Sequence, residues 1–128
     1  MCGVSLLIVD AANVVGSVPD GWWRDRRGAA VRLRDSLVGY TDSGGDAVEV
    51  VLVVEGAARG VGSVEGVRVE SAPGSGDDRI AELAAEAGAA GLECTVVTAD
   101  RELRRRVEAY GARCAGPRTV RQPPGERT

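Results

Sequence analysis

The chain contains no histidine and no lysine, so all 16 basic residues among its 128 are arginines. Without histidine it cannot build a Ser-His-Asp or Cys-His nucleophile system, a histidine general base or a histidine-ligated zinc site. Any chemistry must therefore come from carboxylates, a bound metal ion, arginines, hydroxyls or thiols.

Aromatic residues are also scarce, with no Phe and only two Trp and two Tyr, so the core must be aliphatic. The apolar share of 44% is typical of a globular protein, and 128 residues suit one domain with its own core. Three cysteines without a CxxC spacing argue against a disulfide framework or a zinc site. An odd number of cysteines with no disulfide pattern favours a reducing, cytoplasmic compartment.

Long hydrophobic runs are absent as well. No run approaches the roughly 20 residues that a membrane-spanning helix needs, and the sequence shows no signal-peptide pattern. The net charge of −3 argues against non-specific nucleic-acid binding through bulk charge, although a local basic face remains compatible with it.

The most informative pattern is a set of short aliphatic runs, each followed by an acidic residue. One run ends in Asp10 and another in Glu55, a third precedes Asp77 and Asp78 across a turn, and a fourth leads to Asp100. In an open parallel sheet the carboxyl ends of the strands share one edge, where ligands bind. Two carboxylates about 4 Å apart repel by roughly 4 kcal/mol at an effective dielectric constant near 20. Such a cluster calls for a cation, and hard oxygen ligands suit Mg²⁺ or Mn²⁺.

Aliphatic runs alternate with segments of helical periodicity along the chain. Strands are predicted at residues 5–9, 47–54, 67–70, 93–98 and 113–115, and helices at 24–38, 77–88 and 100–110. This alternation predicts a single-domain α/β fold with a mostly parallel central sheet flanked by helices. We expect a loop directly after the first strand, a mobile glycine-rich loop at 56–66, a domain covering 1–116 and a disordered tail at 117–128.

Three ordered blocks of sequence resemble NYN domains, a branch of the PIN-like nucleases, and in particular YacP-type bacterial proteins. They are Leu6-Leu7-Ile8-Val9-Asp10 with Asn13, Gly74-Ser75-Gly76-Asp77-Asp78-Arg79-Ile80, and Val96-Val97-Thr98-Ala99-Asp100-Arg101. Their order and spacing match over roughly residues 4–115. The resemblance implies a Rossmann-like PIN/NYN fold and a divalent-metal-dependent ribonuclease that cleaves RNA with metal-activated water.

Transferred by position, the resemblance implies a catalytic set of Asp10, Asp77 and Asp100, with Mg²⁺ or Mn²⁺ held by these three and by Asp78. Asn13 would orient Asp10 or the substrate phosphate, and Thr98 and Arg101 would contact the RNA. Arginines near the first loop, Arg24 and Arg27, could hold RNA phosphates through paired hydrogen bonds. Trp22 and Trp23 could stack on unpaired bases or pack against the sheet. A ribosome or a regulatory protein partner and a dimeric state stay open.

Each acidic residue also has a purely structural explanation. Asp100 could cap the helix after it, and Ser75 and Asp78 have the spacing of a capping box. Helix capping is a poorer explanation for Asp10, because no helix is predicted to start directly after it. A catalytically inactive NYN-like domain that binds RNA or protein is the alternative function. A phosphatase or receiver domain is disfavoured, because both use a lysine and the dehalogenase type needs an acid where this chain has Ala12.

Overall fold

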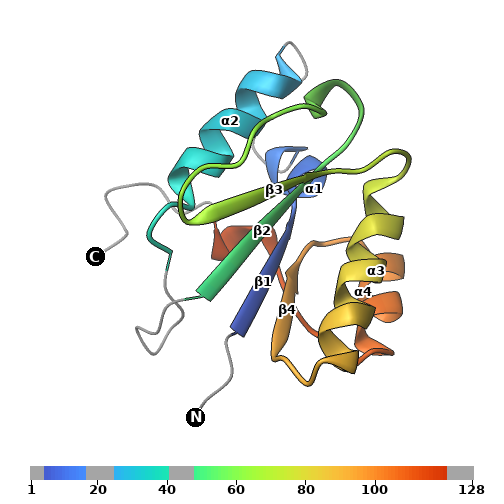
Figure 1. Ribbon diagram of the computed structural model, residues 1–128. Coiled ribbons are helices and arrows are strands. Elements are labelled where there is room, and N and C mark those ends of the chain that lie inside the picture. The colour runs from blue at the N-terminus through green and yellow to red at the C-terminus, as the bar shows by residue number, and fades with distance from the viewer. Residues whose placement is uncertain (1–4, 17–24, 41–47, 121–128) are drawn as a thin grey trace.

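The computed structural model describes residues 5–16, 25–40 and 48–120, which form a parallel sheet covered by helices on both faces (Figure 1). The described strands run in the order β3-β2-β1-β4-β5, and every pairing between them is parallel. Their bounds are β1 Ser5–Asp10, β2 Val48–Val54, β3 Val67–Ser71, β4 Cys94–Val97 and β5 Arg113–Ala115. The predicted α/β fold is confirmed, and each strand lies within about two residues of its predicted position.

Four described helices complete the two outer layers. They are α1 Ala11–Gly16, α2 Arg26–Ser36, α3 Gly76–Ala89 and α4 Arg101–Glu108, with short 3₁₀ turns at Gly56–Ala58 and Pro117–Thr119. Alternation along β1 explains the layering, because neighbouring side chains point to opposite faces of a sheet. Leu7 and Val9 pack with α1 and α2, whereas Ile8 packs with α3 and α4. Both halves of the core are almost wholly aliphatic, as the composition predicts.

The helix predicted at 24–38 begins at Arg26, and its first turn is capped. The side chain of Asp25 accepts a hydrogen bond from the backbone N–H of Gly28 at 2.9 Å. An acid in this position satisfies one of the amide groups that the first turn leaves without a partner. Arg24, a candidate phosphate ligand, lies outside the described residues, as do Trp22 and Trp23, for which base stacking and packing against the sheet were both left open.

One of the two expectations for the loops is wrong, and the other stays a prediction. Residues 56–66 are mostly turns and coil, as expected, but Ala58 and Val61 are buried and Arg27 donates to the carbonyl oxygens of Arg59 and Gly60 at 3.0 and 3.1 Å; the mobility of this loop stays a prediction. Residues after β1 are helical rather than looped, since α1 starts at Ala11 directly after Asp10. Ala11 and Val14 form the buried face of this short helix. The segment is too short for its helical periodicity to be evident in the sequence.

The boundary expected at residue 116 is too early. Pro117–Thr119 form a 3₁₀ turn, and Val120 is only 1% exposed within the core on the side of α1 and α2. The prediction ended the domain too early because Val120 is a single apolar residue among charged residues and prolines, so the sequence pattern there is typical of a disordered tail. The domain therefore extends at least to Val120, and the rest of the expected tail lies outside the described residues.

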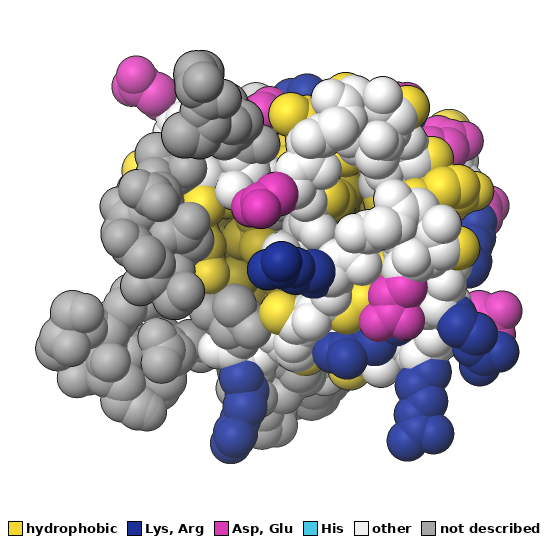
Figure 2. Space-filling model, turned by 90° about the horizontal axis from the view of Figure 1, so that it is seen from below, with side chains coloured by type: hydrophobic (Ala, Val, Ile, Leu, Met, Phe, Trp, Pro, Cys, Tyr) yellow, Lys and Arg dark blue, Asp and Glu magenta, His cyan; other side chains and the backbone are white. Residues whose placement is uncertain are grey.

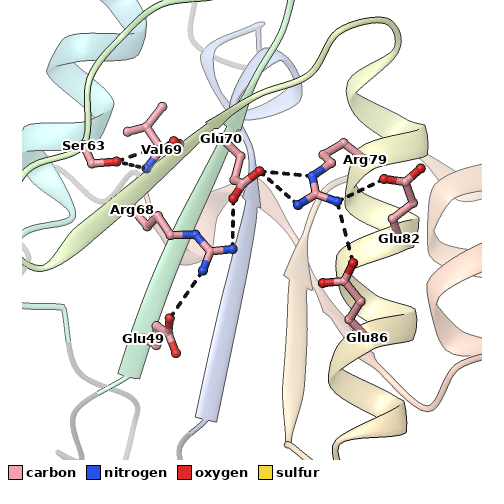
Figure 3. Close-up of polar contacts among 8 residues, drawn as sticks. All are labelled: Glu49, Ser63, Arg68, Val69, Glu70, Arg79, Glu82 and Glu86. Carbon is pink, nitrogen blue, oxygen red and sulfur yellow. Dashed lines mark hydrogen bonds and ion pairs between the residues drawn. The ribbon is translucent and has the colours of Figure 1, made fainter.

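A chain of ion pairs joins the edge strand β3 to α3 (Figure 3). Arg79 of α3 contacts Glu70 of β3 at 3.1 Å, and Glu70 also contacts Arg68 at 3.0 Å. Single exposed pairs contribute about 1 kcal/mol or less, but Arg79 also contacts Glu82 and Glu86 in the same network. The network aligns α3 with the sheet and so helps to set where the first turn of α3 lies.

The acidic residues singled out in the sequence lie at the end of the sheet that faces away from the viewer in Figure 2. Figure 2 views the molecule from below Figure 1, toward the amino-terminal ends of the strands, and acidic and basic side chains are interspersed there with apolar ones. The acidic residues singled out in the sequence follow the carboxyl ends instead: Asp10 ends β1, Glu55 follows β2 and Asp100 follows β4. The candidate site is therefore at the upper edge of the sheet in Figure 1.

Candidate functional site

Asp10 is the centre of the candidate site and is only 5% exposed. One of its oxygens, Oδ2, accepts a hydrogen bond from the hydroxyl of Thr98 at 3.0 Å. The other, Oδ1, accepts a longer one from the backbone N–H of Asn13 at 3.4 Å. Because α1 begins at the next residue, the contact with Asn13 also caps that helix, so the argument that Asp10 has no helix to cap is wrong.

Burial raises the pKa of Asp10 to about 6. The hydrogen bonds from Thr98 and Asn13 oppose that rise, and the negative charges of Asp77 and Glu55 add to it. A buried carboxylate whose neighbours are also carboxylates is costly to keep ionised, so the ionised form of Asp10 lowers the stability of the fold. Groups of this kind concentrate at functional sites.

Asp77 lies in the first turn of α3, beside the other acids. Partial burial raises its pKa, and the charges of Asp100 and Glu55 raise it further, while Arg106 opposes them. The N-cap of α3 is Ser75, whose hydroxyl accepts a hydrogen bond from the N–H of Asp77 at 3.1 Å. Of the three acids predicted to be catalytic, Asp77 is thus close enough to Asp10 and to Asp100 for their charges to interact.

Glu55 fixes the start of α3 to the end of β2. Its Oε1 accepts a hydrogen bond from the backbone N–H of Gly76 at 2.8 Å. A Cβ atom on Gly76 would collide with this same oxygen, so any larger residue there would push the carboxylate away from the N–H group. An anion at a helix N-terminus is stabilised by the unpaired amide groups and by the helix dipole. The sequence pattern left the role of Glu55 uncertain, whereas the structure makes it the support of the turn that carries Asp77.

Thr98 and Asn13 connect the elements that carry Asp10 and Asp100. The hydroxyl of Thr98, which is fully buried, donates to Asp10 and accepts from the N–H of Asp100 at 3.2 Å. The side-chain oxygen of Asn13 accepts from the N–H of Ala99 at 2.9 Å. These contacts suit the orienting role that was one of the two predicted for Asn13, and they give Thr98 a similar role. Contact of either residue with RNA stays a prediction.

The remaining acids and arginines have identifiable partners. Asp100 caps α4 by accepting from the N–H of Leu103 at 3.1 Å, and the exposed Asp78 pairs with Arg106 at 3.1 Å. Arg104 donates to the carbonyl oxygen of Thr98 at 2.8 Å, which braces the turn before α4 and had no signal in the sequence. Arg27 is occupied by loop carbonyls, and Arg101 is exposed at the start of α4.

The residues that the structure describes contain no closed metal centre. Among the residues that the structure describes, no three acidic or cysteine side chains are placed so that they could hold a metal ion as they stand. Mg²⁺ does not need such a cage, because it usually retains several waters and is bound through one or two carboxylates together with substrate phosphates. Asp10 and Asp77 are the two carboxylates best suited, since each lies in a field of negative charge that a cation would relieve.

The strand order and the acids at the ends of β1, β2 and β4 belong to a single-domain α/β fold with a parallel central sheet, which is consistent with a PIN/NYN-like fold. No protein-family model matches the chain, and no curated protein sequence does so either. Two solved structures of Rae1 (YacP) from Bacillus subtilis, one of them a tryptophan-to-leucine variant, are similar to it with 22% sequence identity and a TM-score of 0.69.

The similarity to Rae1 extends over almost all of this chain. It covers 91% of this chain and 72% of the variant's chain, and 90% and 70% for the other structure. At this identity the likeness establishes the fold, and the resemblance to YacP-type NYN domains is confirmed at that level. No described helix has the length and apolar character needed to cross a membrane.

Proposed function

We propose that this chain is a ribonuclease that hydrolyses RNA phosphodiester bonds with the help of a divalent metal ion, Mg²⁺ or Mn²⁺. The observation that carries the proposal is the buried carboxylate of Asp10, at the carboxyl edge of the sheet, with Asp77 and Glu55 close enough to raise its pKa. The nuclease-like fold shared with Rae1 (YacP) is consistent with this chemistry.

In the proposed reaction Asp10 and Asp77 hold the ion, and Asp100 lies beside them at the start of α4. A bound divalent ion would supply a water of lowered pKa and would neutralise charge on the phosphoryl oxygens. Thr98 keeps Asp10 oriented, because its hydroxyl is itself fixed by the N–H of Asp100. Arg101 is exposed next to Asp100 and would bind a phosphate of the RNA.

The test is a cleavage assay with the purified chain on single-stranded and structured RNA, with Mn²⁺ or with EDTA. We expect metal-dependent cleavage that Asp10→Asn reduces by at least two orders of magnitude, since electrostatic groups at reacting centres commonly contribute about 10²–10³ in rate. Asp35→Asn is the matched control, because Asp35 is an exposed acid of α2 paired with its neighbour Arg34. Full activity of Asp10→Asn in the presence of metal would refute the mechanism.

One observation favours a second function, a domain that binds RNA without cleaving it. Asp100 and Glu55 both use carboxylate oxygens to hold backbone N–H groups, and the described residues form no ready three-ligand cage. This alternative predicts retention of RNA in a gel shift with no turnover at any metal concentration. It also predicts that Asp10→Asn leaves RNA affinity unchanged.

A further inference from the structure

A small cavity opens beside the acids, on the side of the sheet that α1 and α2 cover. Its volume is about 160 Å³, and its apolar walls include Ala11, Ala12, Ala30 and Ala58. Glu55 also lines it, so the cavity adjoins the acidic edge. We propose that this cavity is a subsite for one nucleobase of the bound RNA, which rests on the proposed function of the neighbouring acids.

The size of the cavity fits a base better than a larger group. A cavity of about 150 Å³ in another protein is large enough to bind benzene, so 160 Å³ accommodates an aromatic ring of the size of a pyrimidine or the inner part of a purine. Gly56 also lines the cavity, and a Cβ built there would meet nothing within 4 Å. The space beside this residue, in the turn that follows β2, is therefore open.

The chemistry of the walls selects the base rather than the phosphate. Alanine methyl groups offer no hydrogen-bond donors to a phosphate, whereas the flat faces of a base lose little by leaving water for an apolar surface. Among the lining residues only Arg26 and Glu55 carry charge, and Glu55 already accepts a hydrogen bond from the N–H of Gly76 through Oε1. Ligand sites of this kind combine apolar walls with a few polar groups that fix orientation.

The position of the cavity follows from the chain itself. Ala11 and Ala12 come directly after Asp10, and Glu55 is the acid that supports the turn of Asp77. A phosphate at the acids would bring the base of an adjoining nucleotide to the mouth of the cavity. The subsite would thus hold the RNA in register, so that one phosphodiester bond faces Asp10.

Binding is measured first, without cleavage, by following backbone amide signals of Gly56 and Ala58 in NMR titrations with nucleosides. We expect adenosine, guanosine, cytidine or uridine to shift these signals, and ribose, which lacks a base, to leave them in place. Ala12→Leu should abolish the shifts, because Ala12 is exposed and its larger side chain would fill the cavity without burying new surface in the core. Ala89→Leu, at the exposed end of α3, is the matched control.

Cleavage provides the second measurement, on oligonucleotides in which one nucleotide near the cut lacks its base. We expect the missing base to raise KM about tenfold in the wild-type protein, in line with the loss of one apolar group from a pocket, and to change nothing in Ala12→Leu. Equal shifts with ribose, or no shift with any nucleoside, would overturn the subsite. Nucleoside shifts without cleavage of any RNA would leave the subsite standing and refute the nuclease.

Discussion

Replacing Gly76 by alanine tests whether the carboxylate of Glu55 holds the turn that carries Asp77. The backbone of Gly76 is not in the left-handed region, so alanine is allowed by its φ and should favour a helix by up to about 1 kcal/mol. Its Cβ, however, would collide with Oε1 of Glu55 and displace it from the N–H of Gly76. A hydrogen bond to a charged group contributes about 1.5–3 kcal/mol. We therefore expect Gly76→Ala to destabilise the fold by about 1–2 kcal/mol.

A double-mutant cycle isolates this contact from the other effects of the methyl group. In Glu55→Ala the oxygen is absent, so adding Gly76→Ala should be neutral or stabilise the protein slightly. The measurement is the free energy of unfolding from urea denaturation of the wild type, both single variants and the double variant. Equal destabilisation by Gly76→Ala in both backgrounds would refute the reasoning. Glu55→Gln keeps an acceptor oxygen and should retain more stability than Glu55→Ala.

Three further predictions concern the same edge of the sheet. Folding raises the pKa of Asp10 from 3.8 to about 6, so the folded protein binds a proton on this carboxyl more tightly than the unfolded chain does. Protonated Asp10 therefore contributes stability at pH below about 4, and this contribution is lost as the pH rises through 6. Asp10→Asn should therefore be more stable than the wild type by about 3 kcal/mol at pH 7.5 and similar to it at pH 4; a constant difference across that range, measured by urea denaturation, would contradict the cause assigned. Thr98→Val should destabilise the fold by about 1–3 kcal/mol, because it leaves the N–H of Asp100 without its acceptor. It should also raise the pKa of Asp10 further, as measured by NMR titration, because the hydrogen bond to the carboxylate is lost. An unchanged pKa would show that the hydroxyl does not orient this carboxylate. Mn²⁺ should raise the melting temperature of the wild type and of Asp35→Asn but not of Asp10→Asn, and an equal rise in all three proteins would place the ion elsewhere.

Stability and the proposed function oppose each other at Asp10. An asparagine would avoid the cost of burying a charge, whereas the proposed metal binding requires the ionised carboxylate. The hydrogen bonds from Thr98 and Asn13 reduce that cost but leave the pKa raised. A stabilised but inactive Asp10→Asn protein would be the expected signature of such a site.

The local pattern of the sequence was sufficient for the strands, for α3 and for the edge at which the acids gather. Continuous aliphatic runs such as Val50–Val54 have one stable environment in a soluble chain, the interior of a parallel sheet, and that fixes where their carboxyl ends lie. The pattern failed where a few apolar residues sit in polar or small-residue surroundings. The helix α1 and the buried Val120 were both missed for this reason.

The sequence by itself determined which residues reach the carboxyl edge, because side-chain periodicity and strand ends are local properties. Only the tertiary structure decided what those residues do there. The approach of β2 to α3 places Glu55 against Gly76, and the approach of β1 to β4 places Thr98 between Asp10 and the N–H of Asp100. These partners are 21 and 88 residues apart in the chain, and no local pattern encodes contacts over such distances, since they arise from the packing of whole elements.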